Sequence, residues 1–309
     1  MQLQNTVVWI CCVKHIIGIR HHPKKYYSIR LSGCMRDWQH IGVDWDSGSW
    51  VAVGVTEDLE FGVEVYERLG ELWNEHRSTV SRIVVDVPIG LCGTVEDPAG
   101  ARIDKDGELH RACDMLARSL IGSRHSSVFN PPCREVVEEA VEPDHGYRLK
   151  DDIYSEMNAK NKALTGKGLT KQGLNIAPGI LEVDDLIRDA QIDNEIMVEG
   201  HPELCFRAFG EEDLDYSKRT APGLAERLEL LRSLDEYTQG TWTDLAMAVG
   251  NVGISPGIDD LTDALALALT ACAEDDEIHS LPGDYPKDGE NMPVRMVYRR
   301  EEPFSLSIE

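Results

Sequence analysis

Short apolar runs and one helical repeat of apolar positions mark the first part of the chain. His40–Asp44 and Arg82–Asp86 are short, mostly apolar runs that end in an acid, and they predict buried strands. Ser49–Val55 alternates and predicts a second strand, with a third at Leu59–Val63. Apolar residues at helical spacing predict a helix over Glu64–His76. We therefore expect a small antiparallel unit, a helix and a further buried strand.

After residue 90 the pattern becomes mostly helical. Residues 91–190 form a longer and more polar section, with loops at Ser126–Arg134 and Gly166–Gly173. Strands are expected again at Glu195–Glu199 and Val294–Tyr298. The predicted helices are Glu108–Ile121, Tyr154–Leu164, Ile180–Asp189, Pro222–Leu234 and Asp259–Ala273.

Acidic residues stand at the ends of three predicted strands and on the last helix. Asp44, Asp86 and Glu199 end strands, and Asp260 and Asp263 lie one turn apart on one helix face. Ligands gather at strand ends in layered α/β sheets. Convergent carboxylates suit Mg²⁺ or Mn²⁺, and two such ions can activate water and stabilise the leaving oxygen in phosphodiester cleavage.

Each of these acids also has a simpler interpretation. Asp44 fits a turn, Asp86 fits a strand end before Pro88, and Glu199 fits a solvated edge. Asp259 or Asp260 fits a helix cap, where a carboxylate offsets the helix dipole. A single acid in so acidic a chain is more often solvated than a ligand, so the prediction depends on the order and placement of the whole set.

Eight motifs follow one another in order along residues 38–297. They are Gly42-Val-Asp44, Val85-Asp86-Val-Pro-Ile-Gly90, Arg111-Ala-Cys-Asp114 with Ala117-Arg118, Arg124-His-Ser-Ser-Val-Phe129, Gln172-Gly-Leu-Asn-Ile176, Glu182-Val-Asp184, Glu199-Gly-His-Pro-Glu203-Leu-Cys-Phe206 and Asp260-Leu-Thr-Asp263-Ala-Leu-Ala. Together they resemble one family, the domain-of-unknown-function family 429, whose members are predicted to be RNase H-like nucleases. The last motif also resembles the final helix of the RuvC Holliday-junction resolvases.

The resemblance implies an RNase H-like α/β fold, with a mixed five-stranded sheet flanked by helices and a largely helical insertion at about residues 91–190, between the fourth and fifth strands. It places Asp44 on the first strand, Asp86 on the fourth, Glu199 on or after the fifth, and Asp260 and Asp263 on the closing helix. It implies a metal-dependent nuclease in which Asp44, Asp86 and Asp263 hold the ions, and Asp260 and Glu199 share or orient them. RuvC has no comparable insertion, so its substrate does not transfer.

Basic residues concentrate in the expected insertion, where residues 150–171 hold five of the eight lysines that follow Met35. A local cationic patch can bind a phosphate backbone whatever the net charge, so we expect a nucleic acid as the partner, of unknown type. The alternative is a solvated face in which Arg111, Asp114 and Arg118 form ion pairs of little energy. The candidate substrate-binding residues are Arg111, Arg118, Arg124, Lys160, Lys162, Lys167 and Lys171.

Other candidate motifs carry less weight. Gly166-Lys167-Gly168 lacks the upstream Gly and the Ser or Thr after Lys that a phosphate loop requires. His201 follows Glu199 by two residues, and it fits either proton transfer, metal binding or a structural position beside Pro202. The cysteines after residue 90 are expected to be small buried hydrophobic residues.

The composition first argues against a nucleic-acid partner. The 309 residues include 31 Lys and Arg and 55 Asp and Glu, for a net charge of −24. Residues 1–34 hold five Lys and Arg and no acid, which leaves −29 on residues 35–309. Dense surface carboxylates keep a chain soluble and suit a salt-adapted, halophilic source.

Residues 1–34 are interpreted as a leader outside the folded domain, which we expect to span residues 35–309. A targeting segment is one interpretation, although Lys14 and His15 split its apolar run. A start codon placed too early, with Met35 the true start, is the other. The eight cysteines form no CxxC pair, and no apolar stretch reaches the roughly 18 residues of a membrane helix. We therefore expect a cytoplasmic protein with no membrane contact.

Two further functions stay open. Sugar kinases and actin-like ATPases share the RNase H-like core, so a phosphoryl-transfer enzyme is one alternative. Such enzymes use Gly-rich phosphate hairpins, and Asp46-Ser-Gly48 resembles such a hairpin only weakly. A non-catalytic binding module that keeps the fold is the other.

Overall fold

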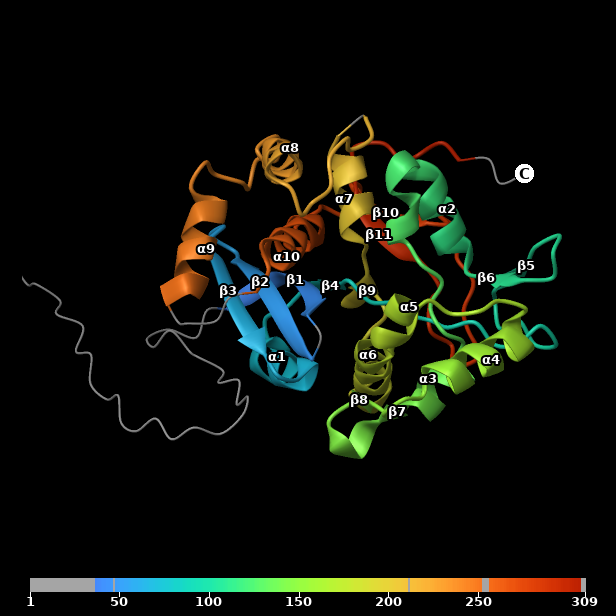
Figure 1. Ribbon diagram of the computed structural model, residues 1–309. Helices are drawn as coiled ribbons and strands as arrows, with labels where there is room; N and C mark the ends of the chain where they lie inside the picture. The colour runs from blue at the N-terminus through green and yellow to red at the C-terminus, as the bar shows by residue number, and fades with distance from the viewer. Residues whose placement is uncertain (1–36, 47, 211, 252–255, 307–309) are drawn as a thin grey trace, which may run out of the picture.

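The computed structural model describes residues 37–46, 48–210, 212–251 and 256–306, and the predicted leader at residues 1–34 lies outside them. Five strands form one mixed sheet in the order β3-β2-β1-β4-β9 (Figure 1). The pairs β1–β2 and β2–β3 are antiparallel, whereas β1–β4 and β4–β9 are parallel. The strands are β1 (Trp38–Asp46), β2 (Ser49–Thr56), β3 (Phe61–Tyr66), β4 (Arg82–Val85) and β9 (Met197–Glu199).

Both faces of this sheet are covered, which explains why its strands are apolar throughout rather than alternating with polar residues. In β4, Ile83 and Val85 belong to one hydrophobic cluster and Val84 belongs to another. The first cluster contains residues of α1 (Leu69–His76) and α6 (Ala177–Asp189). The second is built around α10 (Ile258–Ala271). The expected α/β architecture with flanking helices is confirmed.

Helix α10 is the central element of the second cluster. All its residues from Leu261 to Ala271 are buried, and most of them are alanine or leucine, so the helix is covered on every side beyond its first turn. It lies directly on β1, because a Cβ at Gly42 would come within 2.1 Å of both Ala264 O and Ala268 N. Among the described residues, no helix has both the length and the apolar content needed to cross a membrane.

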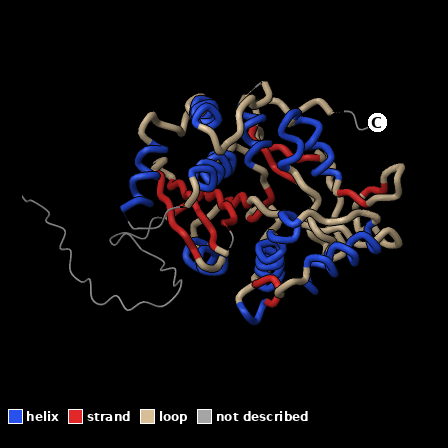
Figure 2. The backbone as a smooth tube through the Cα atoms, viewed as in Figure 1, coloured by secondary structure: helices blue, strands red, loops and turns tan. Residues whose placement is uncertain are grey.

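The stretch between β4 and β9 is largely helical, as expected, with short hairpins between its helices (Figure 2). Helix α6 anchors this stretch to the sheet, because the Glu182 carboxylate accepts hydrogen bonds from Trp50 Nε1 at 3.1 Å and from the Leu69 N–H at 2.7 Å. The other elements of the stretch are β5 (Arg102–Ile103), β6 (Leu109–His110), α2 (Ala112–Leu120), α3 (Arg134–Ala140), β7 (Val141–Glu142), β8 (Arg148–Leu149), α4 (Tyr154–Thr165) and α5 (Lys171–Asn175), with 3₁₀ turns at Gly122–Ser127 and Pro143–His145.

The remaining elements follow β9 and complete the second cluster. Helices α7, α8 and α9 precede α10 in the chain, and a two-stranded hairpin follows it (Figure 1). These elements are α7 (Pro202–Phe209), α8 (Ala221–Leu231), α9 (Thr241–Asn251), β10 (Ile278–Leu281) and β11 (Met296–Arg299).

Two predicted helix starts are wrong, for the same physical reason. Residues 64–66 belong to β3, because they pair with β2 in register Ala52↔Glu64 and Trp50↔Tyr66. Residues 109–110 form β6, and Arg111 is extended before α2 begins. In both cases strand pairing overrides a local helical spacing of apolar residues.

Helices α3, α7 and α9 were not predicted, and the predicted Gly166–Gly173 turn gives way to α5 at Lys171. Helix α7 begins with Pro202 at its first turn, a position that proline tolerates because its N–H would be unpaired there. Proline at residue 202 therefore starts a helix, although the sequence pattern suggested only a strand break.

The close contact between Gly42 and α10 predicts that position 42 does not tolerate a side chain. We expect Gly42→Ala to lower the free energy of unfolding by about 3 kcal/mol, because the added methyl group has to push the helix off the strand. Gly70→Ala is the control, since a Cβ at that helical position meets no atom within 4 Å and should stabilise by about 0.5 kcal/mol. Urea unfolding of both variants measures this, and equal stabilities would contradict the packing described.

Candidate functional site

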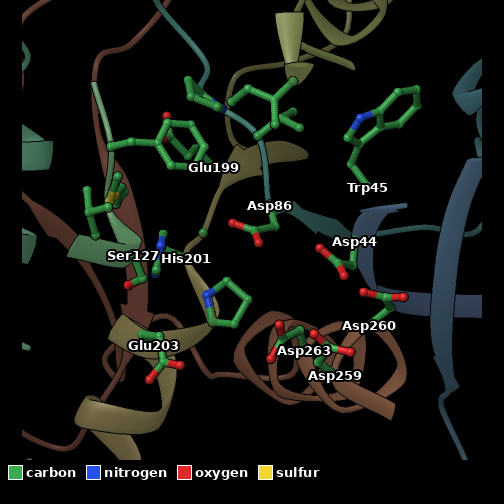
Figure 3. Close-up of a pocket in the computed structure, with 18 of the residues that line it drawn as sticks. Asp44, Trp45, Asp86, Ser127, Glu199, His201, Glu203, Asp259, Asp260 and Asp263 are labelled. Atoms are coloured by element: carbon green, nitrogen blue, oxygen red, sulfur yellow. The ribbon is translucent and has the colours of Figure 1, made fainter. Parts of the chain in front are cut away.

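A cavity of about 230 Å³ opens at the edge of the sheet where β1, β4 and β9 end. The carboxyl ends of β1 and β4 lie at the same edge because these strands are parallel. The first turns of α10 and α7 and parts of the insertion complete the walls. Asp44, Asp86, Asp260 and Asp263 point toward a common space (Figure 3).

Asp44 and Asp86 form the inner part of this site. Asp44 lies on β1 and is 6% exposed, and Asp86 directly follows β4, where its N–H donates to Val43 O at 2.9 Å. Burial raises the pKa of both, and for Asp44 the nearby charges of Asp86 and Asp263 raise the pKa further.

Asp263 and Asp260 come from α10, one turn apart. Asp260 caps the helix by accepting the Gly257 N–H at 2.8 Å, and burial raises its pKa. Asp263 is 1% exposed, and its Oδ1 has no hydrogen-bond partner among the described residues. Burial raises the pKa of Asp263 to about 7, although Lys218 acts in the opposite direction. The simple helix-cap interpretation is therefore correct for Asp260 but does not account for Asp263.

Lys218 supplies a counter-charge that sequence analysis missed. It lies in the segment between α7 and α8, and its ammonium group forms an ion pair with Asp263. The carboxylates of Asp263, Asp44 and Asp86 together raise the pKa of Lys218, against the effect of burial. No local pattern around residue 218 marks this lysine, because its partners come from three distant parts of the chain.

Glu203 and His201 flank the aspartates at the start of α7 (Figure 3). Arg227 donates to Glu203 Oε1 at 2.5 Å, while Glu203 Oε2 and His201 Nδ1 have no partner among the described residues. His201 lowers the pKa of Asp86, after the larger and opposite effect of burial. Glu203 belongs to a motif recognised in the sequence, but only its position on α7 brings it to this cavity.

Glu199 ends β9 as predicted, yet its carboxylate is turned to other partners. It forms an ion pair with Arg111 and accepts the Ile89 N–H at 2.7 Å. Arg111 is 1% exposed and also contacts Asp114 at 3.3 Å. Burial raises the pKa of Glu199 to about 7 in spite of Arg111. The structure therefore places Glu199 in a buried ion cluster that joins β9 to α2, on the wall of the cavity and apart from the aspartates.

The predicted phosphate-binding residues do not converge on the cavity. Arg111 is buried, and Arg118 braces the loop before α3 by donating to Val128 O and Asn130 Oδ1, both at 2.6 Å. Arg124 donates to Asp215 O at 3.1 Å. Arg118 therefore supports the insertion internally, whereas Arg111 and Arg124 connect it to β9 and to the segment after α7.

The lysines of the insertion are similarly engaged or distant. Lys160 forms an ion pair with Glu139, and Lys167 lies 3.2 Å from Glu108. Lys171 lies over the Tyr154 ring, and Lys162 is exposed. Within the described chain, the lysine that lines the cavity is Lys218.

The donors of the cavity fit a hard divalent cation. Asp44 and Asp263 are buried oxygen donors, Asp86 is a half-buried one, and one ammonium group, that of Lys218, lies among them. Among the described residues Asp263 Oδ1 has no hydrogen-bond partner, so it is available as a metal ligand. Across the described residues, no three of these carboxylates bring oxygens within 4.8 Å of one another, so the donors are spread over the cavity wall.

Fold and site together define an α/β protein with an acid-lined cavity at the carboxyl edge of a mixed sheet. The chain belongs to the family described as protein of unknown function DUF429, which it matches over residues 42–287. The match includes all four aspartates of the site. No curated protein and no solved structure matches the chain.

The buried aspartates predict how stability depends on pH and metal. The pKa of Asp263 is about 7 in the folded protein, whereas its ordinary value is 3.8. The contribution of Asp263 to the free energy of unfolding is therefore largest below about pH 4 and is lost as the pH rises through 7. We expect 10 mM Mg²⁺ to raise the melting temperature more at pH 8 than at pH 5, because the cation replaces the missing protons. Thermal unfolding at both pH values measures this.

Asp263→Asn should reduce the difference between the two pH values, whereas Asp58→Asn, at an exposed position, should leave it unchanged. A magnesium effect of equal size at both pH values, or one that persists in full in Asp263→Asn, would contradict this account of the site.

Proposed function

We propose that this protein is a metal-dependent phosphodiesterase that hydrolyses phosphodiester bonds of DNA or RNA, with an RNase H-like site. The observation that carries the proposal is the convergence of Asp44, Asp86 and Asp263, two buried aspartates and one half-buried one, from the ends of two parallel strands and from the helix that covers them. An arrangement of buried carboxylates beside a cavity suits phosphoryl chemistry that uses metal ions.

Asp44, Asp86 and Asp263 would hold Mg²⁺ or Mn²⁺, with Asp260 at the entrance. When bound, the metal supplies an activated water and stabilises charge on the phosphate and on the leaving oxygen. The chain itself orients these carboxylates. The β1–β4 pairing fixes Asp44 beside Asp86, and the contact of α10 with Gly42 fixes Asp263 opposite them.

Neighbouring residues set the charge and the solvent access of the site. Lys218 lies among the aspartates and limits their mutual repulsion. His201 and Glu203 each present an unpartnered atom, Nδ1 and Oε2, and these atoms can hold or pass a proton near the phosphate. Val87, Pro88 and Val128 form an apolar part of the wall, which restricts bulk water.

The two alternatives receive less support. A phosphoryl-transfer enzyme of this class would need a Gly-rich phosphate hairpin between β1 and β2, but the two residues between the paired Asp46 and Ser49 include one glycine, Gly48. A non-catalytic module has no need to bury Asp44 and Asp263 beside Asp86, because burying carboxylates lowers stability.

Substitution of the aspartates tests the proposal. We expect Asp44→Asn and Asp263→Asn each to lower kcat for bis(4-nitrophenyl) phosphate with Mn²⁺ by about 100-fold or more, because each removes a charge that holds the metal. Asp58→Asn is the exposed control and should keep wild-type activity. Full activity in Asp44→Asn, or no Mn²⁺-dependent hydrolysis by the wild type, would overturn the proposal.

Lys218 gives a second test with a binding readout. We expect Lys218→Met to bind Mn²⁺ about tenfold more tightly by calorimetry, because it removes a cation from among the carboxylates. Lys105→Met is the control, since Lys105 is exposed and does not line the cavity. Weaker Mn²⁺ binding by Lys218→Met would show that the lysine supports the metal site instead of competing with it.

A further inference from the structure

The lining of the cavity is chemically mixed. Besides the aspartates, it includes apolar and aromatic side chains. Those that matter here are Trp45, Pro88, Val128, Phe129 and Ile176. A phosphate at the aspartates would therefore have an apolar surface beside it.

Trp45 is held as a fixed platform in this wall. Its ring packs against Trp50, with centroids 4.6 Å apart, and against α6, where a Cβ at Gly179 would come within 3.0 Å of the ring. Trp45 is half-buried, and it follows Asp44 directly in β1. Trp45 is one of the residues that line the cavity, together with the aspartates. Nucleic-acid bases stack on such aromatic faces in proteins that bind single strands.

The size of the cavity limits what can enter. A volume of about 230 Å³ lies below the roughly 300–1,000 Å³ of ordinary small-ligand pockets, so it suits a single nucleotide unit. A base that is paired and stacked in a duplex has to leave the helix to reach such a pocket. The bases of a single strand are already unpaired, so no energy is spent on taking a base out of a duplex.

The charges around the cavity also disfavour a duplex. A protein that binds duplex DNA typically contacts about 6–10 phosphates with lysine and arginine. Of the residues that line this cavity, Lys218 and Arg219 are the lysine and arginine, and they face Asp263 and Asp259 respectively. The arginines and most of the lysines predicted to bind phosphate are instead engaged with other residues of the protein.

We infer that the substrate is a short single-stranded oligonucleotide, of which one nucleotide enters the cavity and stacks its base on Trp45. This inference rests on the proposed phosphodiesterase function and adds the substrate class. Trp45 acts as a binding residue that positions the phosphate next to Asp44, its neighbour in the chain.

The test compares three ligands: pentathymidylate, an abasic strand of the same length, and a 20-base-pair duplex with closed ends. Fluorescence anisotropy in Ca²⁺ measures binding, and hydrolysis in Mn²⁺ measures kcat/KM. We expect pentathymidylate to bind and react at least about tenfold better than the duplex. The ratio of kcat/KM for pentathymidylate over the abasic strand should fall about tenfold in Trp45→Leu, because one stacked base contributes roughly 1–3 kcal/mol.

Two variants control for loss of structure. Trp45→Phe keeps an aromatic ring and should restore most of the ratio. Trp73→Leu removes a half-buried tryptophan that does not line the cavity, and it should leave the ratio unchanged. A fall in Trp73→Leu equal to that in Trp45→Leu would overturn the inference.

Failures of the two proposals give different results. If the protein hydrolyses bis(4-nitrophenyl) phosphate but binds the duplex as tightly as pentathymidylate, the proposed function stands and the inferred substrate is wrong. If it binds pentathymidylate through Trp45 but hydrolyses nothing, the inferred binding site stands and the proposed function is wrong. Absence of both binding and hydrolysis overturns both proposals.

Discussion

The contact between α10 and β1 at Gly42 is the constraint on which the site depends. Because glycine has no side chain, the backbone of α10 lies against the strand, with Ala264 O and Ala268 N 2.1 Å from where a Cβ would stand. Asp44 is two residues from Gly42, and Asp263 immediately precedes Ala264. The same close contact that completes the hydrophobic core therefore brings two acids from residues more than 200 positions apart to one cavity.

Burial of these acids creates an electrostatic problem that the rest of the structure reduces but does not remove. Lys218 approaches the aspartates, and Arg227 pairs with Glu203 in the same region. Arg227 also donates to Tyr216 O at 3.2 Å, so one buried arginine both compensates Glu203 and supports the segment that carries Lys218. Burial is the main cause of the raised pKa values of Asp44, Asp86 and Asp263, so the charged forms of these groups are poorly solvated in the cavity. A bound cation would stabilise those charged forms.

Sequence alone predicted the part of the site that depends on regular elements. Asp44 and Asp86 end adjacent parallel strands, and Asp260 and Asp263 share a helix face, so periodicity and strand ends were sufficient to find them. Sequence patterns do not reveal the roles of Lys218 and Glu203, or the ion pair of Glu199 with Arg111. Each depends on a partner that is distant in the sequence and comes near only in the folded protein. For the basic residues of the insertion, closeness along the chain did not predict closeness in space. They cluster in the sequence, but ion pairs with Glu108, Glu139 and Glu199 hold them at separate places in the structure.

The difference between exposed charges and charges gathered in the cavity also explains how a protein with a net charge of −24 can bind the proposed phosphate substrate. Interactions between exposed charges are screened beyond about 8 Å at physiological salt and beyond about 3 Å at 1 M, so surface carboxylates repel a substrate only at short range. The aspartates of the cavity are buried and are screened much less. They therefore set the local field, and a divalent cation can reverse its sign there while the surface stays acidic. An acidic surface then disfavours long nucleic acids, which need many phosphate contacts, more than a short strand that makes its contacts inside the cavity.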